Sequence, residues 1–286
     1  MNNVISVKDL PLSLLNHRHK AIDSHLKIAI LADLLKNKII EDGIETGNFE
    51  IGKDGQLFLK TNMNFESFAG FMFESYCVNE INTSKIIKEK CYRCATGKYY
   101  ARDSINTYYA IGTGLLTTKS KHTHLYSTSS NMDILFVRDN EKLNVSEPAN
   151  IKDSTIHAGI QLKAIRSNFK EEIIEPILSG KYDKVLTLLN KDSRMHSYDE
   201  CRAIIRRMWY KSLITEEEKI KLYESIYSPE QLGFDRQEIE DYYELAKAFY
   251  FKKSNADKHI FNAIALESTN YKMNDAGILV PENIST

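Results

Sequence analysis

The chain has 286 residues, of which 42% are hydrophobic and 27% are charged. This balance is typical of a globular protein, and a chain of this length can bury a sizeable core without disulfides or a structural metal. The 38 basic and 39 acidic residues give a formal net charge of -1, which excludes the strongly basic balance of many nucleic-acid binders. Any surface for a polyanion must therefore be a local patch.

The N-terminus, MNNVISVKDL, lacks the basic-then-apolar pattern of a signal peptide. No apolar run approaches the roughly 20 residues that a membrane helix needs. The chain has 4 cysteines, which we expect to be reduced thiols. These features predict a cytoplasmic protein that does not interact with a membrane.

Residues 1–64 are predicted to form an N-terminal region with one helix and one hairpin. Apolar residues at helical spacing predict the helix over residues 17–41. Residues 49–60 contain two short alternating runs around an Asp-Gly pair, which is typical of a β-hairpin.

Residues 65–195 are predicted to form a mixed α/β core flanked by helices. A buried helix is expected over residues 65–81. The stretch 84–126 is rich in Tyr, Thr and Lys, which favours strands and loops. Short apolar runs then predict strands and one helix, with a loop or hairpin inserted over 139–155; the strands are 132–138, 156–165 and 182–189, and the helix is 168–178.

Residues 196–286 read as a helical C-terminal region with a loose tail over 272–286. Pro229 and Gly233 interrupt the pattern. The candidate helices are 199–212, 215–227, 235–252 and 255–266.

Three polar residues on two of the predicted strands form the candidate site. Asp133 begins one strand, and Gln161 and Lys163 lie two apart on the next, so the latter two project from the same face. Such a set suits phosphodiester hydrolysis, because carboxylate and amide oxygens hold Mg²⁺ and a lysine steadies the phosphate. Glu74, favoured over Glu66, would complete the metal shell, since its apolar neighbours indicate burial and a buried carboxylate needs a partner.

This arrangement resembles the PD-(D/E)xK nuclease superfamily, which includes many restriction endonucleases and Holliday-junction resolvases. The family core runs helix, three strands, helix, strand. The departures are a Gln at 161 where most members have Glu or Asp, a Met at 132 where the motif has Pro, and a long interval of 28 residues between Asp133 and Gln161. The pieces of this sequence that match the core are FESFAGFMFESYCVNEI, MDILFV, GIQLKA, NFKEEIIEPIL and YDKVLTLL.

The resemblance implies a restriction-endonuclease-like fold and an endonuclease that depends on Mg²⁺ or Mn²⁺. Asp133, Glu74 and Gln161 would hold the metal, and Lys163 would position the water or the phosphate. The expected substrate is DNA rather than RNA, in restriction or defence, and a homodimer is expected because two strands must be cut.

Two stretches are candidates for substrate contact. The first lies in KSKHTH, just before the Asp133 strand, and the second lies on the predicted helix that starts near residue 199. The alternative for the first is an ordinary polar loop, and for the second an amphipathic helix with solvated arginines. The candidate residues are Lys119, Lys121, His122, His124, Arg202 and Arg206.

Other motifs and functions remain as alternatives. Cys91 and Cys94 resemble half of a zinc site without a second half, and Gly112-Thr113-Gly114 is too short for a phosphate loop. The chain is alternatively a non-catalytic nucleic-acid-binding or assembly module on the same fold, or an unrelated α/β protein whose helical C-terminal region docks a partner.

Overall fold

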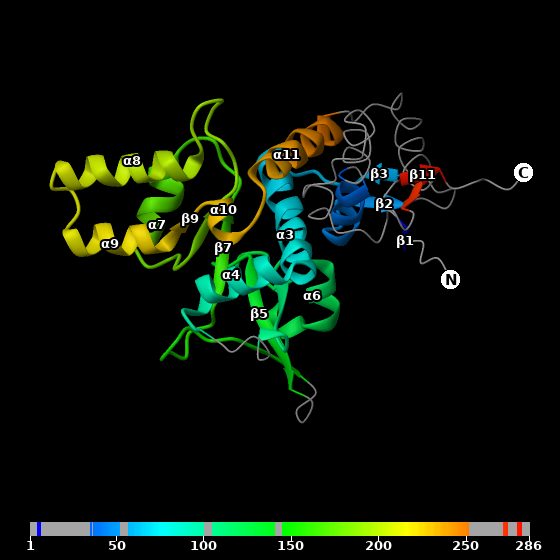
Figure 1. Ribbon diagram of the computed structural model, residues 1–286, viewed down its shortest axis with the longest axis horizontal. Coiled ribbons are helices and arrows are strands. Elements are labelled where there is room, and N and C mark those ends of the chain that lie inside the picture. Colours follow the sequence, from blue (N-terminus) through cyan, green and yellow to red (C-terminus); the bar gives the residue numbers. More distant parts are fainter. Residues whose placement is uncertain are drawn as a thin grey trace, which may run out of the picture. The chain divides into compact units, whose positions relative to one another are not determined.

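The computed structural model describes residues 5–6, 35, 37–51, 57–99, 105–140, 145–251, 271–273 and 279–281. The chain forms two compact units (Figure 1). The first combines Met1–Asn62 with Glu244–Thr286, and the second is Met63–Tyr243. This division differs from the one drawn from the sequence, because most of the C-terminal helices share a unit with the predicted core.

In the first unit, residues 37–45 are helical and are followed by the antiparallel hairpin of β2 (Phe49–Ile51) and β3 (Leu57–Leu59). The predicted hairpin is thus confirmed. The helix predicted over 17–41 lies largely outside the described residues, and the one over 255–266 lies entirely outside them.

A second sheet in this unit joins short segments from both ends of the chain. Its strands, in order, are β1 (Ile5–Ser6), β10 (Tyr271–Met273) and β11 (Leu279–Pro281), all antiparallel. The expectation of a loose tail is therefore wrong for β10 and β11. Strands of two and three residues carry too few alternating positions to be recognised in a sequence.

The second unit is built on a mixed sheet of six strands, with the order β4-β5-β7-β8-β9 and with β6 paired to β5. The contacts β4–β5, β5–β6 and β5–β7 are antiparallel, whereas β7–β8 and β8–β9 are parallel. This confirms the predicted mixed α/β class, and β6 supplies the hairpin expected over 139–155. The strands are β4 (Tyr109–Gly112), β5 (Ile134–Asn140), β6 (Val145–Pro148), β7 (Gly159–Lys163), β8 (Val185–Thr187) and β9 (Ile226–Tyr227).

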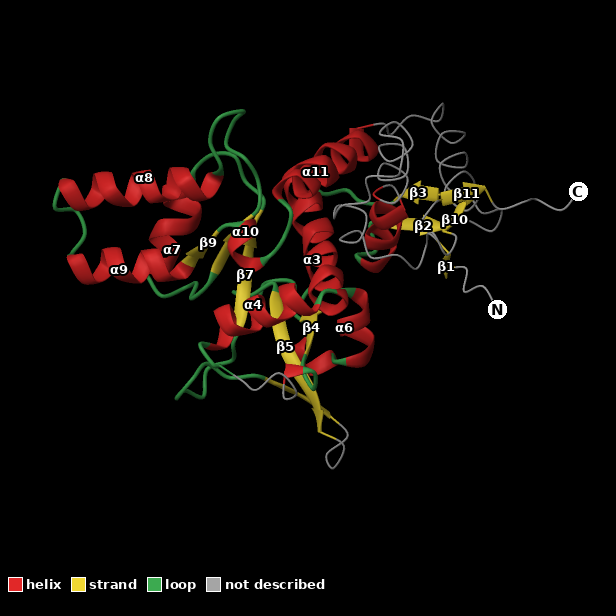
Figure 2. Ribbon diagram, in the orientation of Figure 1, coloured by secondary structure: helices red, strands yellow, loops and turns green. Residues whose placement is uncertain are grey.

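Helices gather at two places around this sheet (Figures 1 and 2). Helices α3 and α4 contact β7, and α3 also contacts β4, whereas η3, α7, α8 and α9 pack together beside β8 and β9. The element η3 is a π-helix. The helical elements are α3 (Phe65–Thr83), α4 (Lys85–Thr96), α6 (Leu116–Lys121), η2 (Thr123–Leu125), η3 (Lys170–Ile174), α7 (Glu175–Leu178), α8 (Ser197–Tyr210), α9 (Glu216–Ser225), α10 (Pro229–Leu232) and α11 (Arg236–Phe251).

The helix α4 corrects the prediction of strands and loops over 84–126. Its first turn is capped by Ser84, whose hydroxyl accepts from the Ile87 amide, and it ends at Gly97 in the left-handed conformation. These are ordinary start and stop signals. The Tyr, Thr and Lys content of the wider stretch obscured them.

The core of the second unit has an aromatic part and an aliphatic part. The central helix α3 is buried along most of its length; Phe73 and Tyr76 pack against Tyr242 of α11, and the Tyr76 hydroxyl donates to Glu238 at 2.7 Å. The aliphatic part fills the space between the sheet and η3, α7, α8 and α9. It includes Ile173, Ile174, Ile177, Val185, Cys201, Ile205, Leu222 and Ile226.

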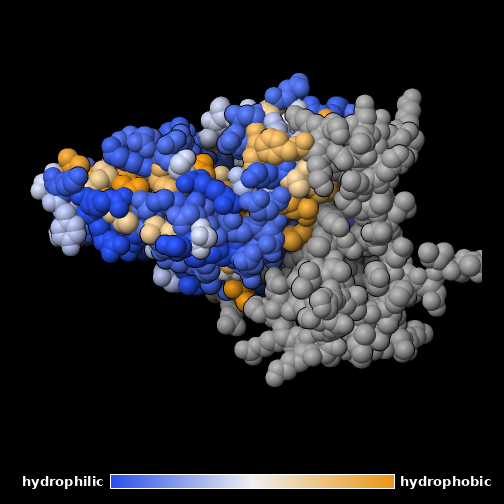
Figure 3. Space-filling view, turned by 90° about the horizontal axis from the view of Figure 1, so that it is seen from above, coloured by the Kyte–Doolittle hydropathy of each residue, from blue (hydrophilic) through white to orange (hydrophobic). Residues whose placement is uncertain are grey.

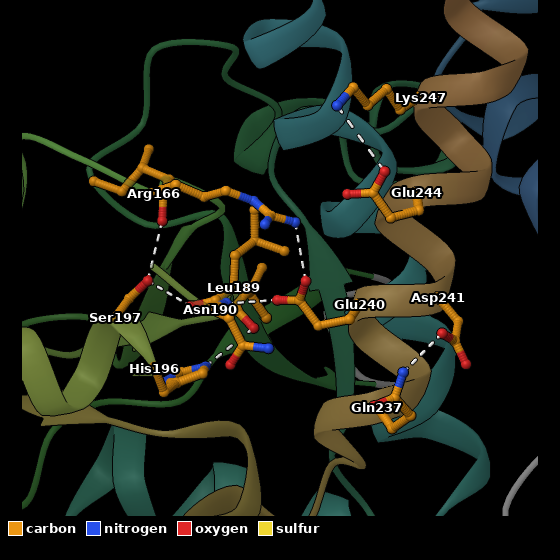
Figure 4. Close-up of polar contacts among 12 residues, drawn as sticks. Arg166, Leu189, Asn190, His196, Ser197, Gln237, Glu240, Asp241, Glu244 and Lys247 are labelled. Atoms are coloured by element: carbon orange, nitrogen blue, oxygen red, sulfur yellow. Dashed lines mark hydrogen bonds and ion pairs between the residues drawn. The ribbon is translucent and has the colours of Figure 1, made fainter. Parts of the chain in front are cut away.

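A polar network joins the end of β7, the segment after β8, the start of α8 and α11 (Figure 4). Arg166 pairs with Glu240 at 2.9 Å, and the other oxygen of Glu240 accepts from the main-chain amide of Asn190. The Ser197 hydroxyl donates to the carbonyl of Leu189. These contacts fix the carboxyl ends of β7 and β8 against the helices.

Where Figure 3 colours the surface, it is mainly hydrophilic with scattered apolar patches. Within the described ranges, no helix has the length and apolar character that crossing a membrane requires.

His196 generates a test of this packing. Its buried ring caps α8, where Nδ1 accepts from the Tyr198 amide at 3.1 Å, and Nε2 therefore donates to the Leu188 carbonyl. Burial lowers the pKa of His196 from its usual 6.5. The folded-state pKa is lower than the unfolded-state pKa. The stabilising contribution of the neutral His196 ring is therefore complete above pH 6.5 and is lost as the pH falls through the folded-state pKa.

We expect the free energy of unfolding to decrease more between pH 7 and pH 5 in the wild type than in His196→Asn, which keeps a helix-capping side chain that does not titrate. Urea titrations at the two pH values measure this difference. An identical pH dependence in both proteins would contradict the assignment.

Candidate functional site

The candidate site lies where β5 and β7 part. The two strands pair only at Ile134 with Ile160 and at Leu135 with Gly159. Strand β7 continues beyond this point beside β8, whereas β5 has not yet begun. The Leu162 amide therefore has no strand partner on that side, and it donates to Oδ2 of Asp133 at 2.7 Å. The Asp133 carboxylate thus accepts the hydrogen bond that a neighbouring strand would otherwise accept.

Gln161 lies against the same carboxylate. Its Nε2 donates to Oδ2 of Asp133 at 2.6 Å. Its Oε1 is buried and has no hydrogen-bond partner. A buried carbonyl oxygen without a donor is costly, so this atom is available as a ligand.

Glu74 approaches from α3 and is only 5% exposed. Its Oε1 accepts from the main-chain amide of Gly114 at 2.6 Å. Burial, opposed by this hydrogen bond and reinforced by the charge of Asp133, raises the pKa of Glu74 from 4.5 to about 8. At neutral pH the carboxyl is therefore largely protonated.

Asp133 is perturbed in the same direction. Burial raises its pKa from 3.8 to about 6, against the Leu162 amide, the charge of Lys163 and the Gln161 amide, all of which lower it. The site thus holds two carboxyl groups that resist ionisation in the absence of a cation.

Glu74, Asp133 and Gln161 line one cavity of about 220 Å³. Hydroxyl groups from α3, from the segment after β4 and from the segment before β5 also line it, together with Phe71 and Phe73. The hydroxyl-bearing residues are Ser67, Thr113, Ser127, Thr128 and Ser130.

Lys163 lies differently from the other predicted site residues. Its Nζ pairs with Glu172 of η3 at 3.1 Å and lies 5.1 Å from the ring centroid of Tyr182. Among the residues that the structure describes, the cavity lining includes Ala164 but not Lys163. The ammonium group is nevertheless near enough to lower the pKa of Asp133.

The residues predicted for substrate contact lie outside the described lining of the cavity. Lys119 and Lys121 are exposed on the last turn of α6, and His122 and His124 follow directly. On α8, Arg202 stacks over the Tyr223 ring at 3.5 Å from its centroid. The remaining residue of this set, Arg206, is exposed on the same helix.

Sequence reasoning missed the residues that complete the cavity. Gly114 donates to Glu74, and the hydroxyl rim comes largely from residues 127–130, to which the sequence analysis gives no role. The available signal was a glycine pair, Gly112 and Gly114, at the end of the apolar strand β4. Glu66, the second choice for the helical carboxylate, is exposed.

The metal-ligating residue types do not form any other centre in the described ranges. No group of three or more His, Cys, Asp or Glu side chains suits a metal ion there, and all four cysteines are buried free thiols. Any cation at the candidate site would therefore depend on two carboxylates and the amide oxygen of Gln161.

Replacing Glu74 by Gln should change how stability depends on pH. The pKa of Glu74 is raised in the folded state, so its favourable contribution is complete below about pH 4.5 and is lost as the pH rises through about 8. We expect Glu74→Gln to become more stable than the wild type by a few kcal/mol between pH 5 and pH 9. Chemical denaturation in metal-free buffer measures this, and a difference independent of pH would contradict the perturbed pKa.

In comparisons with protein-family models, with curated proteins and with solved structures, the chain has no significant match.

Proposed function

We propose that the unit Met63–Tyr243 is the catalytic part of an endonuclease that depends on Mg²⁺ or Mn²⁺, has a restriction-endonuclease-like fold and acts on DNA. The observation that carries this proposal is the set of oxygen ligands around one cavity, contributed by Glu74, Asp133 and Gln161. A restriction or defence role is the biological setting that the resemblance favours.

The residues at the site fit a small, hard cation. Mg²⁺ is bound in proteins by one or two carboxylates and keeps several waters. Glu74 and Asp133 supply the carboxylates, and the unpartnered Oε1 of Gln161 supplies a neutral oxygen. Burial, and to a smaller extent the charge of Asp133, raises the pKa of Glu74, and a divalent cation would favour the ionised form against both effects.

The chain's own groups have distinct parts in the proposed reaction. When bound, a divalent cation supplies Lewis-acid polarisation of the phosphate and activation of water. Asp133 and Glu74 bind the cation and Gln161 assists. Lys163 stabilises negative charge on the phosphate, while the hydroxyl rim orients the substrate and Lys119, Lys121, His122, His124, Arg202 and Arg206 contact the nucleic acid.

For this role the Lys163 ammonium must exchange Glu172 for the phosphate. The side chain of Glu172 is 53% exposed, whereas that of Lys163 is only 12% exposed. Water therefore screens the pair only in part. The long, flexible stem of lysine allows the ammonium group to change partner.

The order of the elements also supports the proposal. Helix α3, strands β4, β5 and β7, then η3 with α7, and finally β8 occur in the order helix, three strands, helix, strand, with α4, α6, η2 and β6 inserted between them. The first three strands are antiparallel neighbours and β8 is parallel to β7. This is the order that the family resemblance implies.

A specific observation favours a second candidate function, a non-catalytic nucleic-acid-binding module on the same fold. Lys163 is paired with Glu172 rather than lining the cavity, and position 161 carries a neutral amide instead of an acid. Both features weaken the charge available for catalysis.

The proposed function predicts that the protein binds a divalent metal ion. We expect Mn²⁺ or Mg²⁺ to stabilise the wild type against thermal unfolding, by about 2.7 kcal/mol at a hundred times the dissociation constant. Glu74→Gln and Asp133→Asn should lose most of this effect, because each removes a charged ligand. Glu66→Gln, on the exposed side of the same helix, is the matched control. Equal stabilisation of all four proteins would place the cation elsewhere.

DNA cleavage is the second prediction. In a plasmid-nicking assay with Mg²⁺ or Mn²⁺, Asp133→Ala and Lys163→Ala should each reduce the rate by on the order of 10² to 10³. Lys181→Ala is the matched control, because its Nζ is also 5.1 Å from the Tyr182 ring centroid. Gln161→Glu adds a negative charge to the metal ligands and should retain activity while metal affinity holds or rises.

The same assays separate the two candidate functions. DNA binding that persists without cleavage in Mg²⁺ or Mn²⁺, both in the wild type and in Gln161→Glu, would favour the non-catalytic module. Cleavage that is lost in the Asp133 and Lys163 variants but kept in Lys181→Ala would favour the enzyme.

A further inference from the structure

The GTG segment, Gly112-Thr113-Gly114, consists of the last residue of β4 and the two residues that follow it. It contacts the Glu74 carboxylate and the main chain at Met132 and Asp133. In the function proposed above, Thr113 and Gly114 serve only as part of the cavity lining. The segment's contacts nevertheless reach both Glu74 and the chain around Asp133.

The two glycines leave room for the Glu74 carboxylate. The Gly114 amide donates to Oε1 of Glu74 at 2.6 Å. A Cβ on Gly114 would lie 2.9 Å from Oε2 of Glu74, and one on Gly112 would lie 2.8 Å from Oε1. A Cβ on Gly112 would also lie 2.6 Å from the Leu115 side chain, and one on Gly114 would also lie 2.9 Å from the Phe71 ring. All of these distances are shorter than real Cβ contacts, so a side chain at either position must displace the Glu74 carboxylate and these neighbours, or the backbone.

Thr113 holds the other side of the site. Its amide donates to the Asp133 carbonyl at 2.9 Å, and its hydroxyl donates to the Met132 carbonyl at 2.8 Å. Its own carbonyl accepts from the Ser127 amide at 2.8 Å. Thr113 thus joins the backbone that carries Asp133 to the hydroxyl rim of the cavity.

We infer that the GTG segment is a positioning element that sets the separation of the Glu74 and Asp133 carboxylates and thereby makes the site select Mg²⁺ or Mn²⁺ over Ca²⁺. This rests on the proposed function, and it adds the determinant of cation size. Consecutive residues bind one carboxylate directly and the backbone of the other, so the linkage between them is short and has few rotatable bonds.

Cation size is sensitive to such a linkage. Mg²⁺ requires near-ideal octahedral geometry with ligands at roughly 2.0–2.1 Å, whereas Ca²⁺ accepts roughly 2.3–2.6 Å and a flexible shell. Carboxylates held at a fixed separation favour Mg²⁺, whose geometric requirement is stricter. If the carboxylates become free to move, binding of Mg²⁺ weakens more than binding of Ca²⁺.

The test uses the full-length chain and measures binding of Mn²⁺ by electron paramagnetic resonance, with Mg²⁺ and Ca²⁺ as competitors. Thr113→Val removes the hydroxyl but keeps the shape, and Thr113→Ser keeps the hydroxyl. Gly114→Ala places a methyl group against Glu74. Gly70→Ala is the matched control, since Gly70 also lines the cavity but a Cβ there meets nothing within 4 Å.

We expect Thr113→Val and Gly114→Ala to weaken Mn²⁺ and Mg²⁺ binding by on the order of tenfold and Ca²⁺ binding by clearly less, because only the strict ion depends on the fixed spacing. The preference for Mg²⁺ over Ca²⁺ should therefore decrease. Thr113→Ser and Gly70→Ala should keep the wild-type preference. Circular dichroism checks the fold of each variant, and if Gly114→Ala does not fold, the Thr113→Val and Thr113→Ser pair decides.

The outcomes distinguish this inference from the proposed function. A wild type that binds Mn²⁺ and cleaves DNA, with an unchanged ion preference in Thr113→Val, would overturn the inference alone. A wild type that binds no divalent cation would overturn both. Equal loss of all three cations in the variants would assign the segment a general structural role and would also overturn the inference.

Discussion

The cost of burying carboxyl groups governs the arrangement of this site. Asp133 and Glu74 are both withdrawn from water, and each is held by a main-chain amide, of Leu162 and Gly114 respectively. Those bonds lower the pKa values, but burial prevails and raises them to about 6 and 8. A fold that keeps two such groups around one cavity gives up stability as the pH rises from about 4, through about 6 for Asp133 and about 8 for Glu74. In the proposed function a divalent cation would compensate, because it would supply the charge that the cavity lacks.

Which parts of the site could be predicted from the sequence depends on how far apart in the sequence the interacting residues lie. Asp133 and Gln161 could be brought together from the sequence, because Asp133 begins a continuous apolar run and Gln161 lies within the next predicted strand, whose residues alternate. The orientation of the Lys163 side chain could not be predicted. It depends on Glu172 and Tyr182, whose positions follow from the packing of η3 and α7. The hydrogen bond from the Gly114 amide to Glu74 joins residues that are 40 apart in the sequence, and no local sequence pattern predicts such a contact.

The π-helix η3 connects the site to the aliphatic core. Its Ile173 and Ile174 are fully buried in the cluster with α8 and α9, while Glu172 points the other way to Lys163. A π-turn inserts a residue into a helix and so changes which side chains face each way. Burial of the two isoleucines fixes that turn, and with it the position of Glu172. The resting place of Lys163 is thus determined by packing on the far side of η3.

The polar network around Arg166 supports the strand that carries the candidate site. Strand β7 carries Gln161 and the Leu162 amide on an edge that β5 leaves unpaired, and an unpaired strand edge has little of its own to hold it. Its parallel pairing with β8 holds one side. Arg166, three residues after β7, is held by Glu240, which also accepts from the amide of Asn190 after β8. Glu240 therefore ties the carboxyl ends of β7 and β8 to one helix, so the two amides that face Asp133 keep their positions without a neighbouring strand.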